Sequence, residues 1–523
     1  MKSKMDLDPI IIDTCHKAAK QVAESVNNGF KGKSTESIER SIVRLIGVDG
    51  IDDNDVPLPN VLIDNIKSGG GLNKGVCYWL GNAMIHTGQD PQTIAKRVSN
   101  SELDLTGLPE NDAPQIYEVI EKYIADSLNR IKDKVEGRRH FYRDIDKSVP
   151  PYIYVLTATG NVYEDVNHAR AVAQNGGDIV AVIRSTAQSL LDYVPYGATT
   201  EGFGGTYATQ ENFRIMRQAL DSWSVDNNRY IRLSSFCSGL CMPEIAAIGV
   251  LEGLDNMVND ALYGILYRDI NMERTLIDQN FSRRINGYFG VVINTGEDNY
   301  LRTADAFEAA SSVVASQMIN YHFALNSGVP EAQIGLGNAF EIPPSVANSF
   351  LIELAQAQLT RELFPNCPVK YMPPTKHMNG NSLRTHACDT LFNLVTIATQ
   401  QGIQTIGVPT EGVFTPHIHD RVMGLENTRY VFDAAKDFYE EIEFKKGGFI
   451  QQRAQHVLQG ACQILEDIAE NGLFEAIEKK TFGNVSRSLK EGKGSEGVFK
   501  CAPDYINPVT DILTDGRLEQ IWT

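Results

Sequence analysis

The stretch DIVAVIRSTAQSLLDYVPYGATTEGFGGT, residues 178–206, predicts both the fold of the chain and a binding site. Its unbroken apolar run, IVAVI, is typical of a parallel β-strand buried on both faces. Arg184 supplies a fixed positive charge directly after this run, and hydroxyl groups follow at Ser185, Thr186 and Ser189. Such a group suits a phosphate, because it offers charge-assisted hydrogen bonds. For Arg184 alone, a surface arginine in a solvated loop is the alternative interpretation.

Eight short β-rich runs alternate with helical patterns along the rest of the chain. They are YIYVLTATG from Tyr152, DIVAVIR from Asp178, RYIRLSSF from Arg229, ALYGILYR from Ala261, YFGVVINTG from Tyr288, IGLGNAFEI from Ile334, VKYMPP from Val369 and TIGVPTEG from Thr405. Eight strands alternating with helices are what a (β/α)₈ TIM barrel requires. An open doubly wound sheet is the structural alternative.

The flanking regions read as helical. We therefore expect an α/β chain with a helical accessory region at residues 1–150, the barrel at 151–446, and a C-terminal helical extension and tail at 447–523. Gly472 is expected to end a long amphipathic helix in the extension. The segment 481–500 is rich in glycine, serine and lysine, and we interpret it as a loop that is mobile or covered by a partner.

Composition narrows the classes of partner. The 523 residues carry a formal net charge of −18, which argues against a nucleic-acid or anionic-membrane surface and leaves small molecules and proteins. No apolar stretch approaches the ~20 residues of a membrane span, and the start, MKSKMDLDP, lacks a signal-peptide core. We expect a cytoplasmic protein whose eight scattered cysteines are reduced thiols.

Polar side chains gather at or just past the predicted carboxyl ends of the β-rich runs. They are Thr157, Thr159, Arg184, Ser235, Ser238, Arg268, Asp298, Asn299, Glu341, Lys370 and Glu411. In a barrel these ends converge on one mouth, where active sites are built. Cations, carboxylates and hydroxyls together predict that the mouth binds a zwitterionic ligand and, in addition, a phosphate.

Two motifs suggest a metal but lack the rest of a site. Cys237 and Cys241 form a C-x₃-C pair, but Glu244 stands where the third cysteine of an iron–sulfur triad would fall. We interpret the pair as structural thiols. His417 and His419 form an H-x-H pair, but the first strand carries no histidine to complete a metal-dependent barrel hydrolase. We therefore expect no metal ligands here.

Pyridoxal phosphate fits the residues at the strand ends better than a metal ion does. It needs a phosphate cradle, a polar partner for the ring nitrogen, a surface against the ring and a lysine. Arg184 and the hydroxyls after it supply a cradle, with Arg268 as a second cation. Tyr263 is positioned to stack on the ring, although a tyrosine in a strand is more often core. Lys370 is the only lysine among these strand ends and a candidate to bind the cofactor, with an ordinary ion-pair role as the alternative.

The segment DIVAVIRSTAQSLLDYVPYGATTEGFGGTYATQENFRIM, residues 178–216, resembles the large subunits of the lysine 5,6-aminomutase family and the barrel part of ornithine 4,5-aminomutase. The resemblance covers most of the chain. It implies a barrel subunit that binds pyridoxal phosphate in an adenosylcobalamin-dependent enzyme. For the lysine enzymes, the implied reaction is a radical shift of the terminal amino group of D-lysine or L-β-lysine to the adjacent carbon.

The resemblance also implies roles for single residues. The implied phosphate contacts are Arg184, Ser185, Thr186, Ala187, Gln188, Ser189 and Arg268. Ser238 is implied to face the pyridine nitrogen, Tyr263 to stack on the ring and Asn299 to contact the phenolic oxygen. Tyr263 is also implied to be catalytic, with substrate contacts at Asp298, Lys370 and Glu411. A serine leaves the ring nitrogen largely unprotonated, which suits a radical rearrangement that needs no electron sink.

One motif of the family is absent. The sequence D-x-H-x-x-G, whose histidine binds the cobalt of cobalamin, occurs nowhere in these 523 residues. In the lysine enzymes a smaller subunit supplies this histidine and also the lysine that binds pyridoxal phosphate. Lys370 loses that role accordingly, and we expect an α₂β₂ complex with a smaller cobalamin-binding subunit. The alternatives are a self-sufficient pyridoxal-phosphate racemase or decarboxylase that uses Lys370, a noncatalytic amino-acid-binding subunit and a metal-dependent hydrolase.

Overall fold

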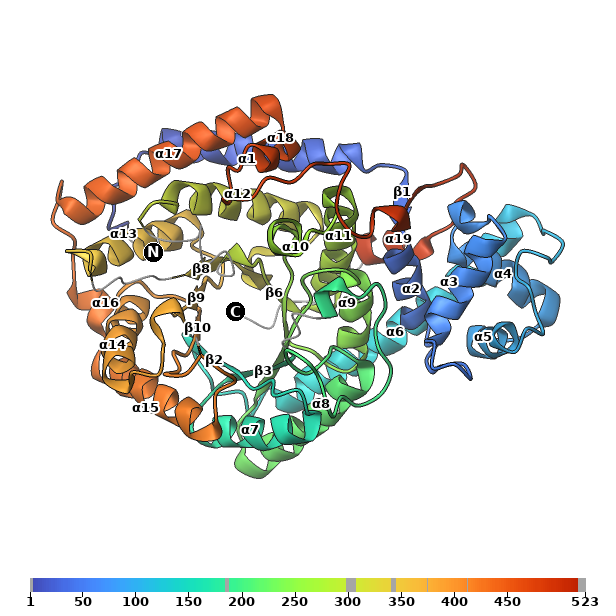
Figure 1. Cartoon of the computed structure of the whole chain (residues 1–523), viewed down its shortest axis with the longest axis horizontal. Helices are drawn as coiled ribbons and strands as arrows, with labels where there is room; N and C mark the ends of the chain where they lie inside the picture. Colours follow the sequence, from blue (N-terminus) through green and yellow to red (C-terminus); the bar gives the residue numbers. More distant parts are fainter. Residues whose placement is uncertain are drawn as a thin grey trace.

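A computed structural model of the chain describes residues 3–183, 188–297, 307–339, 345–373, 375–411 and 413–515. Helices surround a ring of parallel strands, and a further group of helices stands to one side (Figure 1). The strands are β1 Lys33–Thr35, β2 Tyr152–Leu156, β3 Ile179–Ile183, β4 Arg232–Phe236, β5 Asn256–Val258, β6 Val292–Asn294, β7 Ile334–Gly335, β8 Gly337–Ala339, β9 Lys370–Met372, β10 Ile403–Thr405 and β11 Val498–Lys500.

The helices fall into three groups along the chain. Those before the ring are α1 Pro9–Gly29, α2 Glu36–Leu45, α3 Leu58–Ser68, α4 Val76–Thr87, α5 Pro91–Ser99 and α6 Ala113–Tyr142. Those between its strands are α7 Val162–Gln174, α8 Gln210–Asn227, α9 Met242–Leu251, α10 Ala261–Arg268, α11 Met272–Phe289, α12 Ala310–Asn326, α13 Ser349–Leu363 and α14 Ser382–Ala398. Those after it are α15 Ile418–Ala434, α16 Phe438–Glu441, α17 Phe449–Asn471, α18 Leu473–Glu478 and α19 Pro508–Asp515.

The ring is a closed (β/α)₈ barrel, as predicted. Its strands pair in parallel in the order β7, β6, β5, β4, β3, β2, β10, β9, β8. β7 and β8 are two parts of one strand that breaks at Leu336, since β7 pairs with β6 and β8 pairs with β9. The ring therefore closes through eight strand positions, which rules out the open sheet. Tyr154, Ile179 and Val292 belong to the buried apolar cluster of these strands.

One predicted strand was wrong. The run from Ala261 to Arg268 is helix α10, and the strand at this position is β5, only three residues long. The Asp260 side chain accepts hydrogen bonds from the backbone N–H groups of Leu262 and Tyr263, both at 3.0 Å, and so caps the helix. The eighth run was misplaced as well, because it overlaps its strand, β10, only at Thr405. The other six runs each contain a strand of the ring.

The terminal helices attach to the barrel in two places. At the top of Figure 1, α1 packs against α12 and α17 through buried apolar side chains, and we call this contact the apolar seam. Its members include Cys15, Ala19, Val22, Val314, Met318, Leu458 and Ala461. At the right of Figure 1, α2 contacts α9 and α11, while β1 pairs in antiparallel fashion with β11. The segment 481–500, predicted to be a loop, thus ends in a paired strand.

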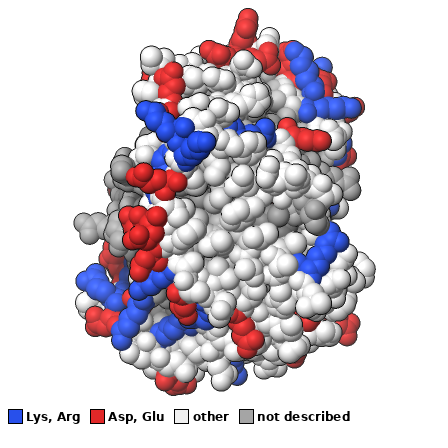
Figure 2. Space-filling model, turned by 90° about the vertical axis from the view of Figure 1, so that its left-hand side faces the viewer, with Lys and Arg blue, Asp and Glu red and all other residues white. Residues whose placement is uncertain are grey.

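Charge is unevenly distributed over the side that lies at the left in Figure 1. Figure 2 shows charged side chains at its top and at its lower left, with a broad uncharged area between them. Helix α14 lies on this side and exposes Leu383 and Leu391. In the part of the chain that the structure describes, no helix is both long and apolar enough to cross a membrane.

Candidate functional site

The predicted site residues divide into two sets. Six of them lie outside the described residues: Arg184, Ser185, Thr186, Ala187, Asp298 and Asn299. Seven are described: Gln188, Ser189, Ser238, Tyr263, Arg268, Lys370 and Glu411. The described residues follow β3, β4, β5 and β10 at the carboxyl ends of the strands, except Lys370, which begins β9.

The loops after β3 and β4 form one packed unit. The backbone N–H of Leu240 donates to the carbonyl of Ser189 at 3.0 Å. Gly239 has a φ of +118°, and a Cβ there would lie 2.6 Å from Cβ of Ser189, so only glycine allows this approach. The Gln188 amide holds both backbone groups of Ala208, at 2.9 and 2.6 Å. Ser189 and Ser238 are therefore held on neighbouring turns.

Ser238 carries a buried hydroxyl that has no partner among the described residues. Its Oγ makes no hydrogen bond to any described residue. Buried hydroxyls in folded proteins almost always have a partner, because an unpaired one costs about 1–3 kcal/mol. The hydroxyl thus has both donor and acceptor capacity left for a bound group.

Helix α10 brings an aromatic ring and a cation to the same place. It lies against the short 3₁₀ helix Gln188–Leu190, and a Cβ on Gly264 would come within 3.7 Å of Gly239 Cα. Nη2 of Arg268 donates to the Tyr263 hydroxyl at 2.6 Å, and its guanidinium carbon lies 5.1 Å from the centre of that ring. Nε of Arg268 is buried and has no partner among the described residues. The turn of Ser189, the turn of Ser238 and α10 therefore converge.

Lys370 was expected at the carboxyl end of its strand but is the first residue of β9, because Lys370–Met372 is the whole strand and Pro373 follows it. Its side chain is buried, with Nζ 5.1 Å from the centre of the Tyr154 ring on β2. Glu411 is half-buried just past β10, where its charge acts on the nearby guanidinium of Arg421. The backbone of Lys370 thus lies at the amino end of β9, and not at the carboxyl end where the sequence predicted it.

A second set of loop contacts was not foreseen. The Asp165 carboxylate accepts hydrogen bonds from the backbone of Thr159, at 2.6 Å, and from the Thr206 hydroxyl, so it ties the loop after β2 to the end of the loop after β3. Burial raises the pKa of Asp165 to about 6. No motif marks this residue, and only its place in the first turn of α7 hints at a structural role.

The motif residues considered for metals have other contacts. His417 is the N-cap of α15, and its backbone N–H donates to Asp420 at 3.2 Å. Cys237 and Cys241 are buried free thiols, and burial raises the pKa of each. Within the described ranges, no three or more His, Cys, Asp or Glu side chains are placed to hold a metal ion.

Comparisons with known proteins identify the family. Residues 5–512 match the family described as "D-Lysine 5,6-aminomutase TIM-barrel domain of alpha subunit". The chain is 53% identical over 515 residues to the lysine 5,6-aminomutase alpha subunit of Fusobacterium nucleatum subsp. nucleatum, covering 98% of this chain and 99% of that protein. It is 51% identical over 516 residues to the same subunit of Acetoanaerobium sticklandii, with the same coverage.

A more distant relative is the D-ornithine 4,5-aminomutase subunit beta of Acetoanaerobium sticklandii. The identity is 28% over 386 residues, which cover 71% of this chain and 52% of that protein. All three relatives are subunits of aminomutases, which are isomerases. This chain belongs to the family of the TIM-barrel alpha subunits of D-lysine 5,6-aminomutase.

Proposed function

We propose that this chain is the pyridoxal-phosphate-binding barrel subunit of a cytoplasmic, adenosylcobalamin-dependent aminomutase. The substrate is D-lysine or L-β-lysine, and the terminal amino group moves to the adjacent carbon. The family supports an aminomutase. The observation that carries the cofactor assignment is the buried Ser238 hydroxyl, which has no described partner, on a turn that converges with the α10 helix of Tyr263 and Arg268.

The described residues fit pyridoxal phosphate in three respects. The Ser238 hydroxyl offers a neutral hydrogen bond to the ring nitrogen. Nε of Arg268 is a buried donor with no described partner, which suits a phosphate oxygen. The Tyr263 ring offers a flat surface for the pyridine ring. Residues 184–189 complete the phosphate contacts in this proposal.

The chemistry of bond migration comes from the cofactors: bound pyridoxal phosphate supplies the π system and adenosylcobalamin the radical. The chain's own residues bind and orient. Ser238 keeps the ring nitrogen hydrogen-bonded without a full positive charge. Asp298, Lys370 and Glu411 bind the charged groups of the zwitterionic substrate. For Lys370, this role requires the long side chain to extend from the start of β9 toward the mouth.

The partner in this proposal is a smaller cobalamin-binding subunit in an α₂β₂ complex, which supplies the cobalt-binding histidine and the lysine for pyridoxal phosphate. Large apolar side chains stand exposed on the loops after β3 and β10, among them Tyr196, Phe203 and Phe414. Large apolar side chains exposed on loops at the mouth are candidates for a protein interface. A partner that covers the mouth also excludes water from the reaction.

The test is turnover of the assembled complex. The full chain and the smaller subunit, loaded with both cofactors, should convert D-lysine or L-β-lysine to the product with a shifted amino group. Tyr263→Ala should lower turnover roughly 100-fold, because the pyridine ring of the cofactor loses the surface that positions it. Tyr430→Ala is the control, since Tyr430 is exposed on α15, far along the helix from the mouth. Size-exclusion chromatography checks assembly of both variants.

Two results would contradict the proposal. One is the lack of turnover of either substrate in the loaded complex. The other is a stable adduct on Lys370 after borohydride treatment of the isolated chain with pyridoxal phosphate, because that adduct belongs to a self-sufficient enzyme.

A further inference from the structure

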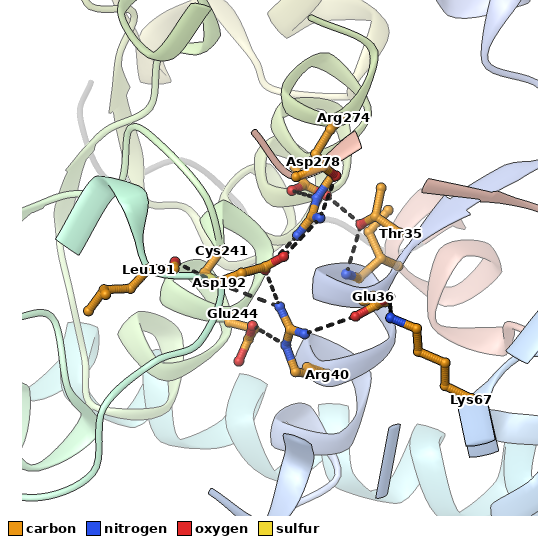
Figure 3. Close-up of polar contacts among 12 residues, drawn as sticks. Thr35, Glu36, Arg40, Lys67, Leu191, Asp192, Cys241, Glu244, Arg274 and Asp278 are labelled. Carbon is orange, nitrogen blue, oxygen red and sulfur yellow. Dashed lines mark hydrogen bonds and ion pairs between the residues drawn. The ribbon is translucent and has the colours of Figure 1, made fainter. Parts of the chain in front are cut away.

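Asp192 lies between two buried arginines, just past the turn that carries Ser189 (Figure 3). Its Oδ1 pairs with Nη2 of Arg40 from α2 at 2.5 Å and with Nη2 of Arg274 from α11 at 2.8 Å. Its Oδ2 accepts a further hydrogen bond from Nη1 of Arg274 at 3.1 Å. The Arg40 and Arg274 side chains are almost wholly buried. Three distant parts of the chain therefore meet at one carboxylate.

The ion pairs continue on both sides of Asp192. Arg40 and Arg44 pair with the fully buried Glu244 of α9, at 2.6 and 3.1 Å. Arg274 pairs with the fully buried Asp278 at 2.8 Å, and Asp278 also accepts a hydrogen bond from Thr35. We call this set the charged joint; its members are Thr35, Arg40, Arg44, Asp192, Glu244, Arg274 and Asp278. Arg40 also pairs with Glu36 at 3.7 Å, and Glu36 pairs with Lys67 at 2.7 Å. Within the charged joint itself three cations face three anions, so the loss of any one leaves another with less compensation.

The charged joint contacts the two turns of the candidate site that carry Ser189 and Ser238. Sγ of Cys241 donates to the carbonyl of Leu191 at 3.4 Å and lies 3.6 Å from Oδ1 of Asp192. Asp192 is three residues past Ser189, and Cys241 is three residues past Ser238. The turn of Ser189 therefore ends at Asp192, a member of the charged joint. The turn of Ser238 ends at Cys241, which contacts Asp192.

Burial alone would raise the pKa of Asp192, but the Arg274 and Arg40 guanidiniums outweigh it and lower that pKa to about 2. The carboxylate is therefore ionised at neutral pH. Arg274 also donates to the carbonyl of Gly494 at 3.0 Å, so the C-terminal segment closes over the same cation.

We propose that Asp192 is a positioning residue for the phosphate of the cofactor: by its two ion pairs it fixes the segment from Ser189 to Asp192 at the mouth of the barrel. Asp192 itself touches no cofactor. The inference rests on the proposed function, because it presumes a phosphate beside Ser189. It assigns a role to the accessory helix α2, which orients a loop of the site through Arg40.

The chain contains a matched control. Asp221 on α8 also lies between two arginines, Arg138 at 2.5 Å and Arg217 at 2.8 Å. Its side chain is 28% exposed, against 31% for Asp192. Arg217 also donates to the carbonyl of Ile231, just before β4, so this cluster lies at the amino ends of the strands. Asp221→Asn therefore removes an equivalent pairing away from the mouth.

The experiment compares two ligands on the cofactor-free complex of the full chain and the smaller subunit. Pyridoxal phosphate and pyridoxal, which lacks the phosphate, are titrated separately and Kd is measured by absorbance. Asp192→Asn should raise the Kd of pyridoxal phosphate roughly tenfold, about 1.4 kcal/mol, and change that of pyridoxal by less than about twofold. Asp221→Asn should leave both within about twofold. Asp192→Glu, which keeps the charge, should recover most of the preference for the phosphate.

Equal changes of the two Kd values in Asp192→Asn, or no difference from Asp221→Asn, would overturn the inference. If Asp192→Asn does not assemble, Arg40→Lys gives the same test, because lysine keeps the charge but cannot bridge Glu244 and Asp192. A wild-type complex that does not bind pyridoxal phosphate would overturn the proposed function as well. A wild-type preference for the phosphate that survives in Asp192→Asn would overturn the positioning role alone.

Discussion

The apolar seam and the charged joint both fasten terminal helices to the barrel, but they do so with different forces. In the apolar seam, small side chains such as Ala19 and Ala461 let α1 and α17 pack closely, and Leu458 fills the contact. In the charged joint, α2 is held by arginines whose hydrogen bonds fix direction as well as distance. Apolar packing in the seam does not depend on direction. The hydrogen bonds of the charged joint do.

The two contacts differ in their distance from the candidate site. The apolar seam lies among outer helices, where burial is enough. The charged joint lies behind the turns of Ser189 and Ser238, where a small displacement changes the geometry of the mouth. Buried ion pairs contribute little net stability compared with apolar packing, but breaking one is costly. The comparison indicates that the charged joint serves geometry and the apolar seam serves stability.

The largest expected effect is the loss of a cation from the charged joint. Arg274→Met leaves the fully buried Asp278 without its cationic partner and should lower the free energy of unfolding by about 3–5 kcal/mol. Urea denaturation measures the loss. Arg214→Met is the control, because Arg214 is 39% exposed beside Glu211 and Glu252, and should cost less than about 1 kcal/mol. Equal losses for the two variants would show that the charged joint is no different from a surface ion pair.

A cavity in the apolar seam should lower the free energy of unfolding somewhat less than Arg274→Met does. It should not change cofactor binding at the candidate site. Leu458→Ala removes a buried side chain of α17 and should lower the free energy of unfolding by about 3 kcal/mol. The ratio of Kd values for pyridoxal phosphate and pyridoxal should stay at the wild-type value. A ratio shifted as in Asp192→Asn would erase the distinction between the two regions.

The apolar seam should also weaken in acid through a histidine pair. Nδ1 of His16 lies 3.3 Å from Nε2 of His322, and burial, with His16 and Lys20 nearby, lowers the pKa of His322 to about 4. Because the unfolded state binds its proton near pH 6.5, stability is present above that pH and is lost as the pH falls toward 4. The loss between about pH 7 and about pH 5 should be about 2 kcal/mol.

The variant His322→Gln should flatten this part of the pH dependence of the urea midpoint. His456→Gln, at an exposed position of α17 in the same region, should retain the wild-type slope. Identical slopes in the wild type and in His322→Gln would mean that the pair does not titrate as described.

Much of the fold was predictable because parallel strands buried on both faces are apolar. The runs at Tyr152 and Asp178 gave strands directly. β5 was missed because it has only three residues and begins with Asn256, whereas the apolar helix after it looked more like a strand. Local sequence does not reveal that the side chain of Asp260 caps this helix.

The candidate site was less accessible to sequence reasoning. The roles of Tyr263 and Arg268 were predicted from the residues themselves, the role of Ser238 came from the family resemblance, and all three roles remain predictions. Asp192 was not singled out, because its partner Arg40 is 152 positions away and lies on a helix that shows only an amphipathic pattern. Ion pairs over such separations depend on how the elements pack, which one sequence does not show.

The most direct test of the account is a crystal structure of the assembled complex grown with pyridoxal phosphate. We expect the phosphate beside Ser189 and Arg268, the ring nitrogen about 3 Å from Oγ of Ser238 and the ring face on Tyr263. A cofactor bound elsewhere on the chain, with the Ser238 hydroxyl facing no atom of it, would contradict the account.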